Sequence, residues 1–433
     1  MSTVTDGDAV DETPRLSRNR DFWLLWSGSG LSVLGSRAGA AGYALLALWH
    51  TGSGQAAGLV AFAALLPNLV VQLPAGALVD RWDRKRLMVA CEVGRAVALL
   101  SVAVTAAAGW FWLPHLMAVA LVETSLGLVH QLAEQGAVRH VVAPHQLGAA
   151  LSRNETRFRA AGLIGGPLGT ALFALTRWLP FAFAALGQLL SLLTLLLIRR
   201  DFQDRRKRDA DRSLVREMRE GVKWLLGQRF LRAAVSLVAA TNVLFQVVML
   251  AVPFALVEEE GRSPVAVGVV LAAGGVGGML GALSAQWWIP RLYLRTVLIG
   301  GLGVWAVLVP LVAVVRQPLL MGLACGAMSY VSGLFNVVAA VYQLRITPDE
   351  ILGRTAGAAG MVAYGASALG ALAGGFMLDG WGSRHTVLAV AVLMAVTALA
   401  AAAVPAVRAA AHPASGGPDP DLPERGEDRI PAV

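Results

Sequence analysis

The sequence predicts an all-α integral membrane protein whose twelve transmembrane helices form two pseudo-symmetric bundles of six. Hydrophobic residues make up 56% of the 433 positions and charged residues 15%, whereas soluble domains carry roughly 25% charged residues. Apolar stretches recur that are long enough to cross a hydrocarbon core of about 30 Å as helices. The alternating polarity of a β-barrel is absent, so helices must satisfy the backbone hydrogen bonds in lipid.

The apolar stretches fall into two sets separated by one hydrophilic segment. The first set comprises residues 22–49, 55–79, 87–109, 114–138, 147–175 and 178–198. The second set comprises residues 231–257, 264–289, 293–315, 318–343, 353–378 and 385–407. We therefore expect a cytoplasmic N-terminal tail (1–21), a first bundle (22–198), a basic cytoplasmic linker (199–230), a second bundle (231–408) and a cytoplasmic C-terminal tail (409–433).

The linker contains a short amphipathic piece. Leu214, Met218, Gly221 and Leu225 recur at helical spacing among basic residues. This spacing favours a helix that lies along the cytoplasmic membrane surface. A solvated linker with only transient helix remains the alternative.

Basic residues are distributed unevenly between the two ends of the expected helices. With the N-terminus inside, 28 of the 36 Lys and Arg residues fall on inner segments and four on outer loops. The positive-inside rule then places both termini in the cytoplasm, and we expect a multi-pass protein of the inner (plasma) membrane. The net charge of +8 is dispersed over these loops, so no nucleic-acid partner is expected.

The two halves show traces of a duplication. A shift of 204 residues matches Pro144 to Pro348 and Gly166 to Gly370. A shift of 210 residues matches Gly58 to Gly268. Because these matches fall on corresponding helices, they indicate an internal repeat of six helices.

The stretch GALVDRWDRKR, residues 76–86, places six charged residues between the second and third expected helices. Its residues Gly76, Leu78, Asp80, Arg81, Arg84 and Lys85 resemble the loop signature of the major facilitator superfamily. Asp83 stands where the usual pattern has a glycine, a variant that resembles the drug and siderophore exporter branch of that superfamily.

The fifth expected helix carries a second resemblance. Gly162, Gly166, Pro167 and Gly169 resemble the G-x-x-x-G-P-x-x-G pattern of the superfamily's exporters, with Thr170 where the last glycine is expected. Small residues beside a proline make a smooth, kinkable surface, which we interpret as a hinge or seal between the halves or as plain helix packing. The stretch EMREGVKWLLGQRFLR before the seventh helix also resembles this branch, which includes macrolide and enterobactin exporters.

The resemblance implies a conformational latch in the loop of residues 76–86. Gly76 is expected to allow close helix packing. Asp80 is expected near the positive N-terminal end of the eleventh helix, with Arg81 or Arg84 beside it. The alternative is that the basic residues of the loop only determine topology, a role that an acidic residue does not serve.

Charged residues inside the apolar spans are candidates for proton coupling, because a charge at mid-bilayer costs about 2.5 to 3.5 kcal/mol on insertion scales and normally has a partner. Arg37 lies near the middle of the first span and Glu123 near the middle of the fourth, followed on the same face by His130 and Glu134. In the resembled fold the first, fourth, seventh and tenth helices line the central cavity, so Arg37 and Glu123 are expected to meet. A permanent ion pair that only helps packing is the alternative.

The seventh and tenth spans carry neutral polar residues. The substrate-cavity candidates are Asn242, Gln246, Met249, Tyr330, Asn336 and Gln343. Such groups among apolar ones suit an amphiphilic organic substrate. Hydrogen bonding between helices, without ligand contact, is the alternative.

The chain departs from the resembled exporters in its intramembrane charges. Many of them carry an acidic residue in the first helix, where this chain has Ser36 and Arg37. The basic residue often found in their fourth helix is also missing.

Several other functions are disfavoured. No G-x-x-x-x-G-K stretch is present, which argues against an ATP-driven pump, and the glycines of GGVGG (274–278) are expected to allow close helix packing. His140 and His145 lack Cys or carboxylate companions, so no metal site is expected. We expect neither an enzyme nor a cofactor.

The predicted function is a secondary active exporter of a small amphiphilic molecule, such as a drug, antibiotic or secondary metabolite. It alternates between inward-open and outward-open states, driven by protons. An uptake permease of the same fold and a non-transporting scaffold or receptor are the alternatives. The expected partners are the substrate, protons and the lipid bilayer, and the expected oligomeric state is a monomer.

Overall fold

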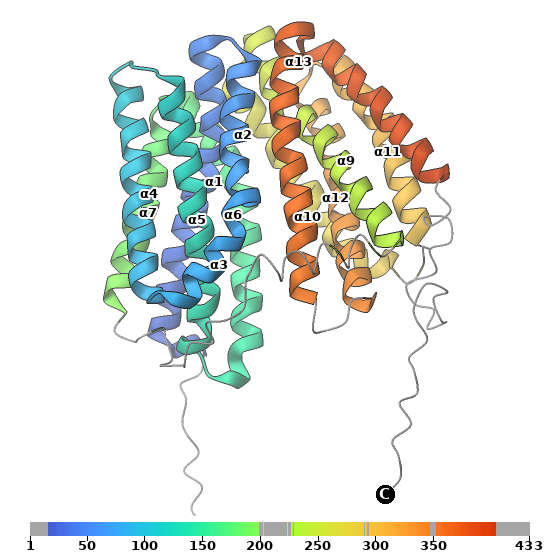
Figure 1. The fold of residues 1–433 in the computed structure, drawn as a ribbon. Coiled ribbons are helices and arrows are strands. Elements are labelled where there is room, and N and C mark those ends of the chain that lie inside the picture. The colour runs from blue at the N-terminus through green and yellow to red at the C-terminus, as the bar shows by residue number, and fades with distance from the viewer. Residues whose placement is uncertain are drawn as a thin grey trace, which may run out of the picture. The chain divides into compact units, whose positions relative to one another are not determined.

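The computed structural model describes residues 16–198, 202, 223, 227, 229–289, 291, 294–346 and 352–403. These residues form helices and, within the described ranges, no β-strand (Figure 1). The all-α fold class is therefore confirmed. The amphipathic piece at 214–225 and the C-terminal tail lie outside the described residues, except for Lys223.

The first half of the chain contains seven α-helices among its described residues. They are α1 (Arg20–Thr51), α2 (Gly54–Val70), α3 (Gln72–Arg81), α4 (Arg84–Ala107), α5 (Leu113–Val141), α6 (Leu147–Leu175) and α7 (Leu179–Leu197). The second half contains α9 (Arg229–Pro253), the π-helical turn η3 (Phe254–Glu259), α10 (Pro264–Trp288), α11 (Leu294–Val314), α12 (Pro318–Ile346) and α13 (Leu352–Ala403). Short 3₁₀ turns η1 (Leu16–Arg18) and η2 (Pro144–Gln146) precede α1 and α6.

Ten helices of the described part are long and apolar enough to cross a membrane. One divided span and one merged pair of spans account for the difference. The expected span 55–79 is divided at Val71 into the shorter α2 and α3. The expected spans 353–378 and 385–407 are merged in α13, which is interrupted at Gly382, where φ is 71°. A positive φ of this kind is readily adopted by glycine and marks the turn between the two spans.

The described residues fall into two compact units. The first unit holds the residues up to Gly42 and those from Val70 onward to the end of α7, and the second holds Tyr43–Leu69 and the described residues from α9 onward. The segment Tyr43–Leu69 groups with the second unit because α2 packs closely on α13. A Cβ at Gly58 would lie 2.8 Å from the Cα of Gly375, and Asp379 accepts a hydrogen bond from the hydroxyl of Ser53 at 2.6 Å.

Close helix packing in the first unit depends on small residues of α1, α6 and α7. A Cβ at Gly35 would lie 2.9 Å from the Cα of Ala184, and one at Gly187 would lie 2.6 Å from the carbonyl oxygen of Leu31. Larger side chains at these positions would therefore separate α1 from α7. The same unit packs α4 against both α5 and α7.

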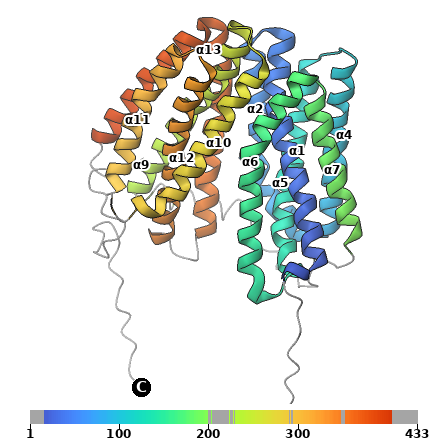
Figure 2. The same ribbon diagram turned by 180° about the vertical axis from the view of Figure 1, so that it is seen from behind.

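In the second unit α10 and α12 run side by side (Figure 2). A Cβ at Gly277 would overlap the carbonyl oxygen of Gly326, and one at Gly281 would overlap that of Tyr330. The structure thus confirms the expectation that glycines of the GGVGG region allow close helix packing. Such contact between backbones is typical of membrane helices, where lipid gives no hydrophobic drive for helices to associate.

Candidate functional site

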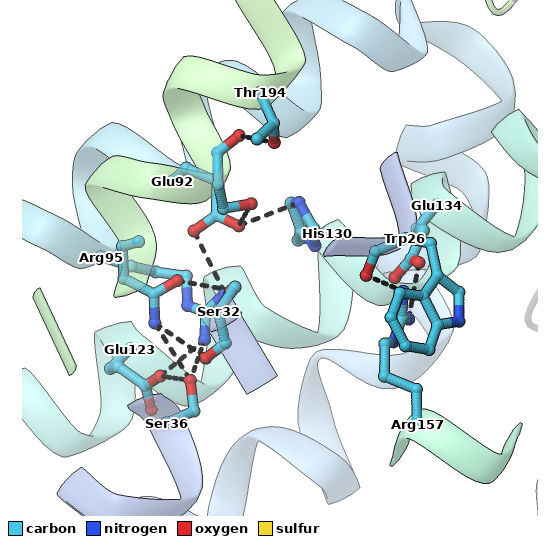
Figure 3. Close-up of polar contacts among 12 residues, drawn as sticks. Trp26, Ser32, Ser36, Glu92, Arg95, Glu123, His130, Glu134, Arg157 and Thr194 are labelled. Carbon is cyan, nitrogen blue, oxygen red and sulfur yellow. Dashed lines mark hydrogen bonds and ion pairs between the residues drawn. The ribbon is translucent and has the colours of Figure 1, made fainter. Parts of the chain in front are cut away.

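The first unit contains a cluster of polar and charged side chains inside an apolar helix bundle, shown in Figure 3. We call it the buried charge network. Helices α1, α4, α5, α6 and α7 all contribute to it. Its members are Ser32, Ser36, Glu92, Arg95, Glu123, His130, Glu134, Arg157, Gln188 and Ser191, and all except the half-buried Ser36 are buried.

Arg95 of α4 lies at the centre of the network. Its Nη1 donates to Ser32 Oγ at 2.9 Å and approaches Glu92 Oε2 at 3.4 Å. Its Nη2 donates to Glu123 Oε1 at 2.9 Å and also to the hydroxyl of Ser36. One guanidinium therefore contacts two carboxylates and two hydroxyls, a use of several donors that its planar fork permits.

Glu92 is fully buried and lies between α5 and α7. Its Oε1 accepts a hydrogen bond from Ser191 Oγ at 2.8 Å. The Nε2 atom of His130 lies 3.1 Å from the same oxygen but makes no hydrogen bond. Glu92 and His130 are thus in close contact without a formed hydrogen bond between them.

Arg157 and Glu134 form a second ion pair in the network. Arg157 Nη2 donates to Glu134 Oε1 at 2.7 Å, and its Nη1 donates to the carbonyl oxygen of Trp26 at 2.9 Å. These bonds connect α6 to both α5 and α1. Each side chain of the pair is at most 8% exposed, so solvent does not screen it.

Neutral groups of α1 and α7 complete the network. Gln188 Nε2 donates to Ser36 Oγ at 3.1 Å, and Gln188 Oε1 accepts from the hydroxyl of Ser32. Ser36 Oγ in turn donates to Glu123 Oε1 at 2.9 Å. Hydroxyl and amide groups therefore supply further hydrogen bonds around Glu123, while the Nε atoms of Arg95 and Arg157 make none that the described residues show.

The local sequence explains how these side chains meet. Ser32 and Ser36 are four residues apart on α1, Glu92 and Arg95 are three apart on α4, and residues at such spacings share a helix face. On α5, Gly127 faces the guanidinium of Arg95, and a Cβ there would be in ordinary contact with the Cζ of Arg95 at 3.6 Å.

The network agrees in part with the sequence expectation. Glu123, His130 and Glu134 share the buried side of α5, as their spacing indicates. The cation recorded in contact with Glu123 is Arg95, which was not among the candidates named from the sequence. Arg37 is exposed, and its Cζ lies 5.0 Å from the ring centre of Phe158. Sequence reasoning missed Glu92 and Arg95, although two charged residues three apart inside the span 87–109 could have revealed them.

The loop after α3 differs from its expected description. No described atom lies within 4 Å of where a Cβ of Gly76 would be. Arg84 and Lys85 donate to the carbonyl oxygens of Phe202 and Ile198, which ties the start of α4 to the end of α7. Arg81 is exposed, and the side chain of Asp80 lies outside the described atoms.

Asp83 has a structural role that explains the missing glycine of the loop. It is the N-cap of α4, and its carboxylate accepts a hydrogen bond from the backbone nitrogen of Arg86 at 2.8 Å. Its φ is −60°, a conformation open to any residue, so the turn does not need glycine. Aspartate is among the preferred N-cap residues.

The glycine surface of α6 is displaced from the expected one. A Cβ at Gly169 would overlap the carbonyl oxygen of Ala38, and one at Gly165 would overlap the side chain of Arg37. Gly162 is exposed with no described atom nearby. The surface that packs on α1 therefore includes Gly169, one of the expected glycines, and Gly165, which was not expected, whereas Gly162 does not contribute to it.

The substrate-cavity candidates of the second unit have different surroundings. Asn242 donates to the carbonyl oxygen of Ala363 at 3.2 Å. The hydroxyl of Tyr330 accepts from Ser284 Oγ at 2.7 Å and from Trp288 Nε1 at 2.8 Å. Both candidates thus take part in helix packing.

For the other candidates of this set, the structure records no hydrogen bond to a neighbouring helix. Gln246 and Met249 are half-buried on α9, and Asn336 is exposed on α12. The side chain of Gln343 lies outside the described atoms. The structure thus leaves Gln246, Met249 and Asn336 as the described side chains still open to a ligand role.

A family model described as Major Facilitator Superfamily matches residues 25–292 and 236–426. The chain belongs to the Major Facilitator Superfamily. The two matches together cover both predicted bundles. This membership confirms the resemblance drawn from the loop at 76–86, and the ten long apolar helices make the chain a multi-pass membrane protein.

Curated relatives of this superfamily member are efflux proteins. The multidrug efflux pump Tap of Mycolicibacterium fortuitum is 26% identical over 398 residues, which is 88% of this chain and 93% of that protein. Macrolide efflux protein A of Streptococcus pyogenes is 24% identical over 375 residues, covering 84% of this chain and 91% of that protein.

Solved structures share the fold. The nucleoside transporter NupG superposes with a TM-score of 0.71 at 15% identity, covering 88% of this chain and 98% of that one. A bacterial homologue of the iron transporter ferroportin in the inward-facing state gives a TM-score of 0.64 at 18% identity, covering 89% of this chain and 100% of that one. At these identities the likeness concerns the fold alone.

Proposed function

We propose that this superfamily member is a secondary active exporter of small amphiphilic organic molecules, powered by proton antiport across the plasma membrane. Two relatives of nearly its full length are a multidrug efflux pump and a macrolide efflux protein. Both termini are proposed to be cytoplasmic, from the excess of basic residues on the inner segments.

The observation that carries this proposal is the buried charge network. Three carboxylates, two guanidinium groups and one histidine lie inside an apolar bundle, and the two closest ion pairs are 2.7 and 2.9 Å long. Burying such groups costs several kcal/mol per ion before their mutual attraction is counted. Ionisable residues at membrane depth therefore point to ion or proton handling by default.

Proton entry supplies enough free energy for export without a nucleotide. Each proton that moves down a potential of 100 mV makes about 2.3 kcal/mol available. Among the described titratable groups, Glu123 of α5 is a candidate coupling residue, because it contacts Arg95 of α4 and Ser36 of α1. A change in its protonation would therefore alter contacts between three helices.

Other residues have proposed roles that follow from family membership. Asp80 is the proposed latch residue of the cytoplasmic loop. Gln246, Met249 and Asn336 are the proposed substrate contacts, because the structure records no hydrogen bond from their side chains to a neighbouring helix. Tyr330 and Asn242 support helix packing instead.

Transport in inverted membrane vesicles tests the proposal. With an imposed proton gradient, acidic inside, wild-type vesicles should accumulate erythromycin, and a protonophore should abolish the accumulation. Glu123→Gln should lose gradient-driven accumulation, since the amide keeps the shape but has no charge to attract Arg95 and cannot change its protonation. Glu155→Gln is the matched control, because Glu155 pairs with Arg159 at 2.7 Å on an exposed helix surface.

The same assay separates the alternatives. Accumulation only in right-side-out vesicles would indicate an uptake permease. If ethidium and a panel of other amphiphilic drugs also show no gradient-dependent movement in either orientation, the export proposal fails and a scaffold or receptor is favoured.

A further inference from the structure

The charges of the buried network do not balance when His130 is neutral. Three carboxylates, those of Glu92, Glu123 and Glu134, face two guanidinium groups, those of Arg95 and Arg157. The formal sum is therefore −1 with a neutral histidine and zero after one proton is added. An uncompensated charge in an apolar interior is costly, so the network favours one extra proton.

The ion pairs show which carboxylate is left without a cation of its own. Arg157 lies 2.7 Å from Glu134, and Arg95 lies 2.9 Å from Glu123. Arg95 reaches Glu92 only at 3.4 Å, with the nitrogen that also donates to Ser32. Glu92 is the remaining carboxylate, and its side chain is 0% exposed.

His130 is placed to share the extra proton with Glu92. Its Nε2 atom lies 3.1 Å from Glu92 Oε1, is buried and makes no hydrogen bond in this arrangement. A protonated His130 can donate to Glu92, and a protonated Glu92 can donate to Nε2 of a neutral His130, once a small side-chain rotation brings donor and acceptor into line. The proton can therefore reside on either of two adjacent atoms, Nε2 of His130 or Oε1 of Glu92.

We propose that the pair Glu92 and His130 is the proton-binding site of this transporter, and that Arg95 relays its state to Glu123. This inference rests on the proposed proton antiport. With the proton bound, the pair is neutral overall and Arg95 remains with Glu123. When the proton leaves, Glu92 carries an uncompensated charge and attracts Arg95, which weakens the contact of Arg95 with Glu123.

The relay connects proton binding to helix contacts. Arg95 Nη2 and Ser36 both contact Glu123 Oε1, so a shift of Arg95 changes how α1, α4 and α5 are held together. Ser191 holds Glu92 from α7 at 2.8 Å. A single proton can thus alter the packing of four helices, which is the kind of coupling that alternating access requires.

The surroundings of the pair contain other charged or titratable groups. Helices α1 and α7 present hydroxyl and amide groups to it, at Ser32, Gln188 and Ser191. The charged or titratable groups that face the pair are Cys91 and Arg95 from α4, Glu134 from α5 and Arg157 from α6, and Glu123 of α5 faces it through Arg95. A test must therefore distinguish Glu92 from the other carboxylates.

Infrared titration of the purified protein tests the site without any substrate. Carboxylic acid and imidazolium bands are recorded against pH for the wild type, Glu92→Gln, Glu123→Gln and Glu155→Gln. We expect one buried group to titrate in the wild type and in Glu155→Gln, and this transition to be lost in Glu92→Gln. In Glu123→Gln the transition should change, because Arg95 is then left to Glu92 alone and the formal charges of the network balance without the extra proton. His130→Gln should retain a transition confined to a carboxylic acid band, because Glu92 alone then holds the proton.

Transport of the same variants gives the second readout. Glu92→Gln should lose accumulation of erythromycin driven by a proton gradient in inverted vesicles, while Glu155→Gln keeps it. Thermal unfolding of each purified variant shows whether it is folded. If Glu92→Gln fails to fold, Glu92→Asp replaces it. That variant keeps an exchangeable carboxyl group and should titrate at a shifted pH.

Two results would overturn the site. An unchanged infrared transition in folded Glu92→Gln would place the proton elsewhere, and so would gradient-driven accumulation by that variant equal to the wild type. Absence of transport in the wild type would instead count against the export proposal. Because the infrared titration needs no transport, the two failures are distinguishable.

Discussion

Arg157 of α6 and Glu134 of α5 form a buried ion pair whose Nη2 and Oε1 atoms lie 2.7 Å apart. Removing one partner of such a pair leaves an unpaired buried charge, which typically costs about 3 to 5 kcal/mol. Arg157→Met should therefore strongly lower the thermal stability of the purified protein. Arg159→Met should change it little, since Arg159 pairs with Glu155 on an exposed surface and such pairs contribute about 0 to 1 kcal/mol.

The double variant Arg157→Met, Glu134→Met separates a structural pair from a functional one. Replacing both charges with apolar side chains is often neutral or stabilising, so thermal stability should recover. If transport recovers with it, Glu134 is a packing residue and not a proton carrier. A double variant as unstable as Arg157→Met alone would contradict the assignment of the pair as a self-contained unit.

The glycines of α6 give a matched comparison. Gly169→Ala should destabilise the protein by about 1 to 3 kcal/mol, because overpacking forces neighbouring backbone to move and a Cβ there would lie 2.8 Å from the Cα of Ala38. Gly162→Ala should retain full stability, since no described atom lies near it. Thermal unfolding of the two variants checks this, and equal losses would contradict the assigned packing face.

The fold could be read largely from the sequence because length and polarity alone decide which segments cross a membrane. The apolar spans, the glycine-mediated contact of α10 with α12 and the face shared by Glu123, His130 and Glu134 all follow from local periodicity. The break at Val71 and the merging of two spans in α13 did not follow, because both depend on how the backbone is held by neighbouring helices.

The network was harder to predict because its pairs join different helices. Spacing shows which side chains share one face, but not which neighbouring helix faces them. Arg95 lies on α4, and only the packing of α4 against α5 brings it to Glu123. Arg95 thus supplies from α4 the cation that the fourth expected span lacks. Ser36 stands in the first helix where an acidic residue is usual, and its hydroxyl contacts both Arg95 and Glu123.

Topology is tested by single cysteines introduced at surface positions. Ser263→Cys should react with an impermeant thiol reagent in intact cells, and His145→Cys should react only after the cells are opened. The native Cys91 and Cys325 are buried, so they should contribute little background. The reverse labelling pattern would overturn the proposed orientation of both termini.

The proposed latch is tested with two aspartates of the same loop. Asp80→Asn should strongly reduce transport while the protein remains folded and expressed, because the amide loses the charge attraction to basic groups and to helix N-termini. Asp83→Ala should behave differently, since Asp83 caps α4 through the backbone nitrogen of Arg86. Losing such a cap costs typically about 1 kcal/mol, so this variant should lose stability and retain most transport per folded molecule.

The comparison depends on measuring both properties for both variants. Transport is normalised to the amount of folded protein in the vesicles, and thermal stability is measured after purification. A loss of transport in Asp83→Ala beyond its loss of folded protein would extend the functional role to Asp83. Near-normal transport by Asp80→Asn would remove the latch, and the charges at residues 76–86 would then be explained by topology and by the bonds that Arg84 and Lys85 make to the end of α7.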